Sequence, residues 1–248
     1  MFFVAGCATS VDNASSTSLV AVPVNAPAAP RVGDKILYIV RNAYNGELVG
    51  QVEYRVEKVD SGRSVLAVGS GSTYPAPPRT EVYAADGNWL RHPLVNHNQL
   101  IDYDFMQPFP AYVFPLESGR AWSQRVNARN TVTGKVNSVR VDGQVLGSER
   151  IATPAGAFDT VKIRRRIYAG DWDGFLLETH IVETDWYSPA LGRSVRLERN
   201  STWLDTSRGA GGGGILGFNN NQQMRGDWLI YELSGAPSMA RRPAAAPR

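Results

Sequence analysis

Cysteine is nearly absent from this sequence, and several familiar signatures are missing. With one cysteine among 248 residues, the chain cannot form an internal disulfide, so its fold must be stabilised by its own core. The serine hydrolase pattern Gly-x-Ser-x-Gly does not occur. No stretch of about 18 consecutive apolar residues predicts a membrane-spanning helix. Disulfide scaffolds, serine hydrolases of this type and helical membrane proteins are therefore not indicated.

The three histidines do not predict a metal site. His92 and His97 are followed by Asp102 and Asp104, which gives four conceivable ligands. Their spacing matches no zinc motif, and the loop expected here would not preorganise them. We interpret them as polar residues of a surface loop, and His180 as a strand residue rather than a catalytic base. We predict no metal.

Glu183 and Asp185 form the most suggestive carboxylate pair. They are two positions apart in a predicted strand, so they share one face of it. That is the minimum requirement for acid–base cooperation in a glycosidase-like cleft. A solvated strand face explains the pair as well. We therefore predict that the protein is not an enzyme and that it needs no cofactor, and we keep an envelope hydrolase as an alternative.

The charge distribution gives no support for nucleic-acid binding. The formal net charge of the chain is +3, but Arg241, Arg242 and Arg248 all lie in its last residues. Without them and without Asp12, residues 31–234 carry a net charge of about +1. A domain so close to neutral has no general attraction to a polyanion.

From Val32 onward the sequence indicates one all-β domain. Short β-rich runs are separated by turn pairs, and a hydrophobic content of 43% is enough for one sizeable core. We predict a single curved, mostly antiparallel sheet or a half-open β-barrel over residues 31–234. Its expected turns are Asn45-Gly46, Ser61-Gly62, Asp86-Gly87 and Asp142-Gly143. The last strand, Asp227 to Leu233, should close the sheet.

The segment from Glu149 to Arg199 organises the predicted sheet. Each of two reversals, Thr153–Asp159 and Trp186–Gly192, combines a proline with a glycine that is free to take positive φ. After the first reversal, apolar residues alternate with basic ones, which is the period of a half-buried strand. The alternation places Arg165 on the buried face.

Three motifs carry a family resemblance. They are Phe-Pro-Leu-x-x-Gly-x-x-Trp at residues 114–122, Thr-Pro-Ala-Gly-x-Phe-Asp-Thr at 153–160, and Trp-Tyr-Ser-Pro-x-x-Gly at 186–192. Over about residues 32–234 the chain resembles an uncharacterised family of proteobacterial envelope β-proteins. The resemblance implies a curved or barrel-like antiparallel sheet exported to the periplasm, with no established activity and no catalytic residues to transfer. The architecture is also similar to the periplasmic lipoprotein-carrier chaperones, which says little about function.

The first residues resemble a lipoprotein signal. Val4-Ala5-Gly6-Cys7 has the pattern of a bacterial lipobox, in which the cysteine is acylated and becomes the mature N-terminus. The segment before it is shorter than a signal peptide, so we interpret residues 1–30 as a signal remnant, lipobox and flexible tether. In this resemblance Ala8 favours sorting to the outer membrane, with the domain on the periplasmic face. The alternative is that Cys7 is an incidental thiol in a disordered leader.

Two further segments stand out by composition. Between His92 and Phe114 the periodicity is lost and aromatic residues accumulate, so we expect a long aromatic loop. It either plugs one end of a barrel or forms the mouth of an apolar ligand site. Residues 209–223 are rich in glycine and are expected to form an insertion before the last strand, and 235–248 a disordered Ala/Pro/Arg tail.

Buried charge suggests a possible ligand contact. Arg165 on the buried face needs either an internal partner, such as Glu149 or Glu183, or an anionic ligand, and we favour the internal pair. Lys162, Arg164 and Arg166 form a basic stripe on the opposite face, which is either a wet surface or a contact for lipid phosphates. The predicted ligand-binding residues are Arg165, Tyr103, Phe105, Phe109, Tyr112, Phe114 and Trp186.

Together these features predict a lipoprotein that is anchored to the outer membrane through Cys7 and faces the periplasm. Its expected role is to bind an apolar or amphipathic envelope molecule, such as a lipid, or a partner protein. One alternative is a structural or assembly lipoprotein with a filled core. A continuous cavity would favour binding, and a packed interior would favour the structural role.

Overall fold

The computed structural model describes residues 30–71, 74–169, 177–205 and 222–235. Within these ranges the chain forms thirteen strands and no helix. The predictions for Cys7, for the tether, for the C-terminal tail and for most of the glycine-rich insertion lie outside the described residues. The strands are β1 (Lys35–Asn42), β2 (Leu48–Asp60), β3 (Arg63–Gly69), β4 (Arg79–Ala84), β5 (Trp89–Asn96), β6 (Gln99–Phe109), β7 (Ala121–Asn130), β8 (Val136–Thr153), β9 (Gly156–Ala169), β10 (Thr179–Ser188), β11 (Arg193–Asp205), β12 (Gln222–Arg225) and β13 (Leu229–Gly235).

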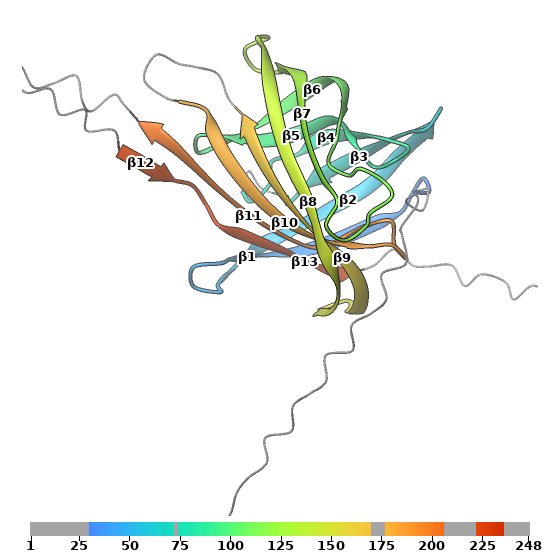
Figure 1. The fold of residues 1–248 in the computed structure, drawn as a ribbon. Helices are drawn as coiled ribbons and strands as arrows, with labels where there is room; N and C mark the ends of the chain where they lie inside the picture. Colours follow the sequence, from blue (N-terminus) through green and yellow to red (C-terminus); the bar gives the residue numbers. More distant parts are fainter. Residues whose placement is uncertain (1–29, 72–73, 170–176, 206–221, 236–248) are drawn as a thin grey trace, which may run out of the picture.

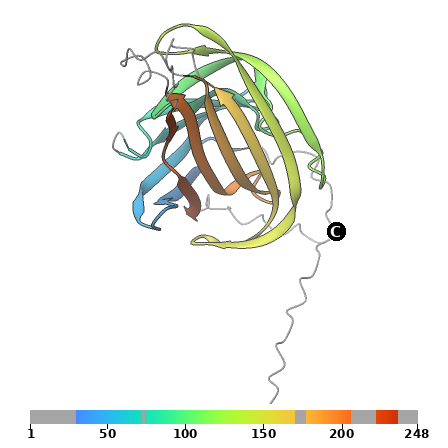
Figure 2. The ribbon, with the colours of Figure 1, turned by 60° about the vertical axis from the view of Figure 1, so that its left-hand side comes forward.

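The strands form a closed antiparallel barrel (Figures 1 and 2). β1 to β10 follow one another around the ring in chain order, and β10 pairs with β11. β13 then lies between β11 and β1, pairing with both. In the described residues β12 pairs with β11 alone, so the other twelve strands make the ring. The all-β, antiparallel prediction is confirmed, and the ring is closed rather than half-open because the last strand joins its two ends.

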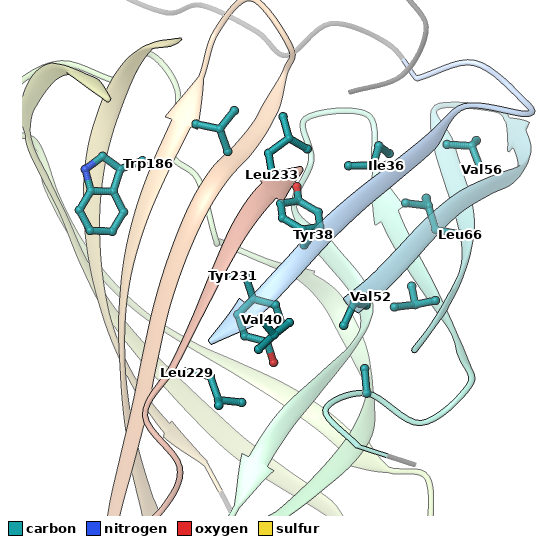
Figure 3. Packing of buried hydrophobic residues seen from close by; sticks show 13 residues of the cluster. Ile36, Tyr38, Val40, Val52, Val56, Leu66, Trp186, Leu229, Tyr231 and Leu233 are labelled. Atoms are coloured by element: carbon teal, nitrogen blue, oxygen red, sulfur yellow. The ribbon is translucent and has the colours of Figure 1, made fainter. Parts of the chain in front are cut away.

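Alternation along the strands fills the barrel. In β1, Ile36, Tyr38 and Val40 are buried, and Val52 and Val56 face them from β2. These residues form the first of three hydrophobic clusters. Figure 3 shows its labelled side chains gathered between β1, β2 and β13, with Trp186 of β10 apart from the others. Burial of this kind contributes roughly 25 cal/mol per Å² of apolar surface, which is the main stabilising term for a fold without disulfides.

The predicted aromatic loop is largely strand, so that prediction is wrong. Residues 92–96 complete β5 and residues 99–109 form β6, joined by a tight turn at His97. Pro93 and Pro108 hid this pairing from the sequence pattern, because proline interrupts a ladder. In the described pairings β4 meets β5 only before Pro93, and β6 meets β7 only over Tyr103–Phe105. Pro93 therefore lies where its strand has a partner on one side only, and Pro108 lies in the irregular part of the β5–β6 ladder between Asp104 and Phe109.

Asp142-Gly143 is not a turn, because both residues lie within the continuous strand β8. The glycine is needed for packing across the sheet. Gly143 pairs with Trp122 of β7, and a Cβ at this position would lie 2.1 Å from the Trp122 ring. The Trp122 indole instead donates a hydrogen bond to the carbonyl of Pro110 at 3.0 Å. A strand interior can contain glycine where another group approaches closely.

The two proline–glycine reversals occur where the sequence placed them. Gly156 has φ of +130° and Gly192 has φ of +66°, which are conformations that disfavour a side chain. The tip of the β8–β9 hairpin reaches the end of β13, where the Ala155 amide donates to the carbonyl of Leu233 at 3.0 Å. That hairpin therefore contacts the strand that closes the barrel.

No segment of the described chain forms a helix of the length and hydropathy needed to cross a membrane.

Candidate ligand-binding cavity

One end of the barrel contains a cavity. Its volume is about 210 Å³, whereas roughly 10–15 Å³ is enough for one water molecule. Its lining includes Asp34 just before β1, Ala85 and Gly87 in the β4–β5 turn, and Leu191 and Gly192 in the β10–β11 turn. β13 ends beside the start of β1, so the chain enters and leaves the barrel at the cavity end.

One wall of the cavity is apolar. It is formed by Ile36, Val56, Leu66, Leu191 and Leu197, contributed by β1, β2, β3, the β10–β11 turn and β11. The first three are inward-facing core residues with 3% exposure or less. Aliphatic side chains of this kind provide no hydrogen bonds, so this wall suits the apolar part of a ligand.

Aromatic side chains surround the remaining space. Those that line the cavity are Tyr38, Tyr54, Tyr83, Trp89, Tyr112 and Tyr231. Trp89 is held between two rings, stacking on His92 at 3.9 Å and on Phe109 at 4.8 Å between ring centroids. Tyr38 donates its hydroxyl hydrogen bond to the carbonyl of Ser194 at 2.7 Å. Such rings combine a large apolar surface with a polar tip.

Arg165 crosses this interior and is fully buried, with 2% exposure. Its Nε donates to Glu183 Oε2 at 3.0 Å, one terminal nitrogen donates to Asp185 Oδ2 at 2.9 Å, and the other donates to the carbonyl of Ala111 at 3.1 Å. Burial alone lowers the pKa of Arg165, but Asp185 and Glu183 outweigh burial and raise it. The guanidinium therefore stays charged inside the barrel, and the predicted internal pair with Glu183 is confirmed.

Asp185 is the centre of this charged cluster. Its Oδ2 also accepts a hydrogen bond from the Tyr112 hydroxyl at 2.8 Å. Burial raises the pKa of Tyr112, and the nearby Asp185 raises it further, so the phenol stays neutral and donates. The second oxygen, Asp185 Oδ1, is buried and has no hydrogen-bond partner within the described part of the chain. A free acceptor therefore remains on a residue that lines the cavity.

A second charged network centres on Glu81, which is fully buried. Arg79 donates to Glu81 Oε1 from Nε at 2.8 Å, and His92 Nδ1 lies 2.9 Å from Oε2, which also accepts from the Tyr83 hydroxyl. Burial raises the pKa of Glu81, but His92 and Arg79 together outweigh burial and bring the pKa to about 2. The carboxylate is thus ionised, and it orients His92 and Tyr83, which both line the cavity.

Arg193 brings a second guanidinium to the cavity wall. Its Nε is buried without a hydrogen-bond partner, and no carboxylate of the described residues forms an ion pair with it. Burial raises the pKa of Tyr38, and Arg193 opposes that shift while Asp185 adds to it. The Tyr38 hydroxyl therefore lies within the electrostatic reach of both charges.

The predicted ligand-binding residues divide into four groups. Arg165 and Tyr112 line the cavity. Tyr103, Phe105 and Phe109 belong to a packed cluster together with Trp89 and are not part of the cavity lining. Phe114 packs against Tyr187, with ring centroids 6.1 Å apart.

Trp186 forms the fourth group. Lys162 and Arg196 lie over its ring at 4.8 and 5.0 Å, and its indole nitrogen donates to Glu149. Lys162 belongs to the predicted basic stripe of β9, so Trp186 contributes to the outer face of the sheet. Glu149 therefore accepts a hydrogen bond from Trp186 and forms an ion pair with Lys162, and it is not the partner of Arg165.

Sequence reasoning missed Glu81, His92, Tyr83 and Arg193 as cavity residues. A weak signal was present in β4, where Glu81 and Tyr83 alternate with the outward Val82, so polar groups occupy the inward positions. A half-buried strand normally has apolar residues at its inward positions, whereas this strand has polar ones. They face a cavity that exists only because the ring is closed.

A group of three or more His, Cys, Asp or Glu side chains placed for a metal is not found in the described ranges. The candidates around the β5–β6 hairpin are engaged elsewhere. Asp104 accepts from Arg91 at 2.8 Å, and His97 Nε2 lies 3.0 Å from the carbonyl of Leu177. His92 contacts Glu81. These side chains point to different partners rather than to one centre.

A second hollow of about 400 Å³ lies at the opposite end of the barrel, near the β5–β6 turn. Its lining includes Arg199, which donates to the Tyr231 hydroxyl at 2.9 Å. Asp227, also in the lining, accepts from the Tyr74 hydroxyl at 3.0 Å. The charged groups here are already engaged, in contrast to Asp185 Oδ1 and Arg193 in the first cavity.

No protein-family model matches the chain, and no curated protein matches it. Similar solved structures include three bacterial proteins. A predicted lipoprotein of Parabacteroides distasonis is 14% identical, with 86% of this chain and 97% of its own covered and a TM-score of 0.46. A predicted exported protein of Bacteroides fragilis with a YmcC-like fold is 14% identical, with 85% and 98% covered and a TM-score of 0.45.

The third is the hypothetical lipoprotein YmcC of Escherichia coli, at 9% identity, with 82% of this chain and 85% of its own covered and a TM-score of 0.36. All three neighbours are thus named as lipoproteins or as an exported protein. Likenesses at this level establish neither a family nor a function for the present chain. The resemblance to the envelope β-protein family remains a prediction.

Proposed function

We propose that this protein binds an amphipathic molecule of the bacterial envelope in the barrel cavity, without catalysing a reaction on it. The observation that carries the proposal is the mixed lining of the cavity. Aliphatic residues such as Ile36 and Leu66 line the same space as the charged groups of Arg165, Asp185 and Arg193. A cavity with both kinds of wall suits a molecule that has both an apolar and a polar part.

The position of the cavity supports attachment to a membrane. Residue 30 and β1 enter the barrel at the cavity end, and the predicted lipobox cysteine, Cys7, lies 23 positions before residue 30. A flexible segment of that length would average roughly 25–30 Å end to end. A lipid on Cys7 would thus hold the cavity end of the barrel near the membrane from which an amphipathic ligand comes.

Anchoring in the outer membrane rests on the sequence pattern Val-Ala-Gly-Cys and on Ala8. Its test is metabolic labelling with palmitate in a Gram-negative host, with a complete signal peptide placed before the lipobox. The wild type should incorporate label and fractionate with outer membranes, whereas Cys7→Ser should be unlabelled and released into the periplasm. A wild type without label would show that Cys7 is an incidental thiol.

Native mass spectrometry tests the binding proposal. Protein purified from an envelope fraction in mild detergent should carry an added mass that corresponds to a lipid or another amphiphile, and organic extraction should remove it. Protein refolded from denaturant provides the control, because it should be empty and should take up added amphiphile. If neither preparation ever binds one, the binding proposal is wrong and the structural role is favoured.

A further inference from the structure

The charged residues of the cavity indicate which charged groups the polar end of the ligand has. Arg165 supplies one positive charge between two carboxylates, Glu183 at 3.0 Å and Asp185 at 2.9 Å. All three side chains are at most 3% exposed. The cluster therefore has one negative charge in excess inside the barrel. An excess buried charge is costly unless another group compensates it.

One acceptor of this cluster is left without a hydrogen bond. Asp185 Oδ2 is satisfied twice, by Arg165 and by the Tyr112 hydroxyl, while Oδ1 has no partner among the residues that the structure describes. A carboxylate oxygen only accepts hydrogen bonds, so its complement is a donor. A cationic donor is favoured over a neutral one because it also balances the charge.

Arg193 lines the same cavity and lacks a hydrogen-bond acceptor. Its Nε is a buried donor without an acceptor, and its positive charge has no carboxylate partner in the described part of the chain. The charges of Arg193 and Asp185 both influence the pKa of Tyr38, and both also influence the pKa of Tyr187. Arg193 and Asp185 also both line the cavity, so the cation that lacks a carboxylate partner and the unpaired carboxylate oxygen border the same space.

We propose that the ligand of this cavity is zwitterionic at its polar end. A primary ammonium donates to Asp185 Oδ1, and a phosphate or carboxylate of the same molecule lies against the guanidinium of Arg193. Phosphoethanolamine, alone or as a lipid headgroup, has this arrangement of charges. The inference rests on the proposed function and specifies the substrate class of that same site: the apolar wall takes the chain, and these two residues take the head.

A comparison of lysolipids with different headgroups tests the proposed zwitterionic ligand without any change to the protein. Lysophosphatidylethanolamine, lysophosphatidylcholine and lysophosphatidylglycerol with one common acyl chain are titrated below their critical micelle concentrations into the full chain by calorimetry. The ethanolamine lipid should bind at least tenfold more tightly than the other two. Choline has no N–H to donate to Asp185, and the glycerol head has no cation. Affinities of the three lipids within twofold of one another would overturn the inference while leaving the proposed function intact.

A protein variant tests the proposed contact between Arg193 and the anionic group of the ligand. Arg193→Gln should weaken the binding of the ethanolamine lysolipid at least tenfold. The affinity for dodecylamine, which has an ammonium and no anion, should stay within twofold of that of the wild type. Arg63→Gln is the matched control, because Arg63 is exposed at the same end of the barrel and does not line the cavity. If Arg193→Gln and Arg63→Gln bind the ethanolamine lysolipid equally well, Arg193 does not receive the anion and the proposal is wrong.

Free O-phosphoethanolamine separates the two sources of the headgroup. Binding much weaker than that of the lysolipid supports a lipid, because the apolar wall then contributes. Binding as tight as the lysolipid supports the zwitterion at Asp185 and Arg193, and it would show that the proposed amphipathic function is wrong. Absence of binding for every compound would overturn both proposals together.

Discussion

Arg165 and Asp185 are joined inside the barrel by a hydrogen bond of 2.9 Å, with 2% and 1% of their side chains exposed. They lie on neighbouring strands, β9 and β10, and Glu183 completes the cluster from two positions earlier on β10. An ion pair this deep contributes little to stability against a well-packed apolar replacement of all its members. Its position in the cavity wall fits the proposed role in binding.

Removing the cation of this cluster should be strongly destabilising. Arg165→Met leaves Glu183 and Asp185 buried without compensation, and we expect a loss of about 3–5 kcal/mol in the free energy of unfolding. Arg164→Met is the control, since Arg164 is exposed on the outer face; it should change stability by less than about 0.5 kcal/mol. Urea unfolding followed by tryptophan fluorescence measures both. Equal midpoints would show that the buried cluster is not held together by Arg165.

The Glu81 network should make stability depend on acid pH. The pKa of Glu81 is lowered from 4.5 to about 2 in the folded protein. The unfolded chain therefore takes up this proton first as the pH falls. The resulting stabilisation, on the order of 3 kcal/mol, is fully present above pH 4.5 and is lost between about pH 4.5 and pH 2.

Unfolding free energies measured from pH 7 to pH 2 check this. Glu81→Gln should be less stable at neutral pH, because its amide cannot pair with Arg79, and its stability should fall less steeply below pH 4.5 than that of the wild type. Glu117→Gln, at an exposed position, should follow the wild-type curve. Parallel curves for wild type and Glu81→Gln would contradict the assignment of the acid sensitivity to Glu81.

Phe109 tests whether the aromatic segment belongs to the core or to a ligand mouth. It is fully buried, stacks on Trp89 with centroids 4.8 Å apart, and lies outside the cavity lining. Phe109→Ala should therefore cost about 3–5 kcal/mol of stability, as expected for a large-to-small core substitution. Met106→Ala, at a residue of the same strand that is 56% exposed, should cost little. A stable Phe109→Ala variant with impaired ligand binding would support the ligand-mouth alternative instead.

Local pattern was enough to predict the inward face of β9, but it left a solvated face open for Glu183 and Asp185 of β10, which are in fact buried. Alternation placed Arg165 between buried aliphatic residues and put Glu183 and Asp185 on one strand face, and their pairing follows from the adjacency of the two strands. The reversals at Gly156 and Gly192 were also predictable, because proline next to glycine marks a change of chain direction. These features depend on neighbours in the sequence.

Features that depend on distant partners were not predictable. Asp142-Gly143 has the composition of a turn, yet the glycine serves the close approach of Trp122 from another strand. Glu81 and His92 are buried polar residues whose mutual contact requires the β4–β5 pairing. Closure of the ring by β13 determines which faces are inside, and a cavity exists only after closure.

The central claim is that the cavity bordered by Leu197 and Arg165 binds an amphiphile, and blocking that cavity tests it most directly. A fluorescent fatty acid is titrated into wild type, Leu197→Trp and Leu146→Trp, with thermal melts confirming that each is folded. Leu197 lines the cavity, whereas Leu146 is 42% exposed on β8. The account predicts saturable binding by the wild type and by Leu146→Trp. It also predicts at least a tenfold loss, about 1.4 kcal/mol, in Leu197→Trp, because the indole occupies the space of the chain. No saturable binding by the wild type, or equal binding by folded Leu197→Trp, would contradict it.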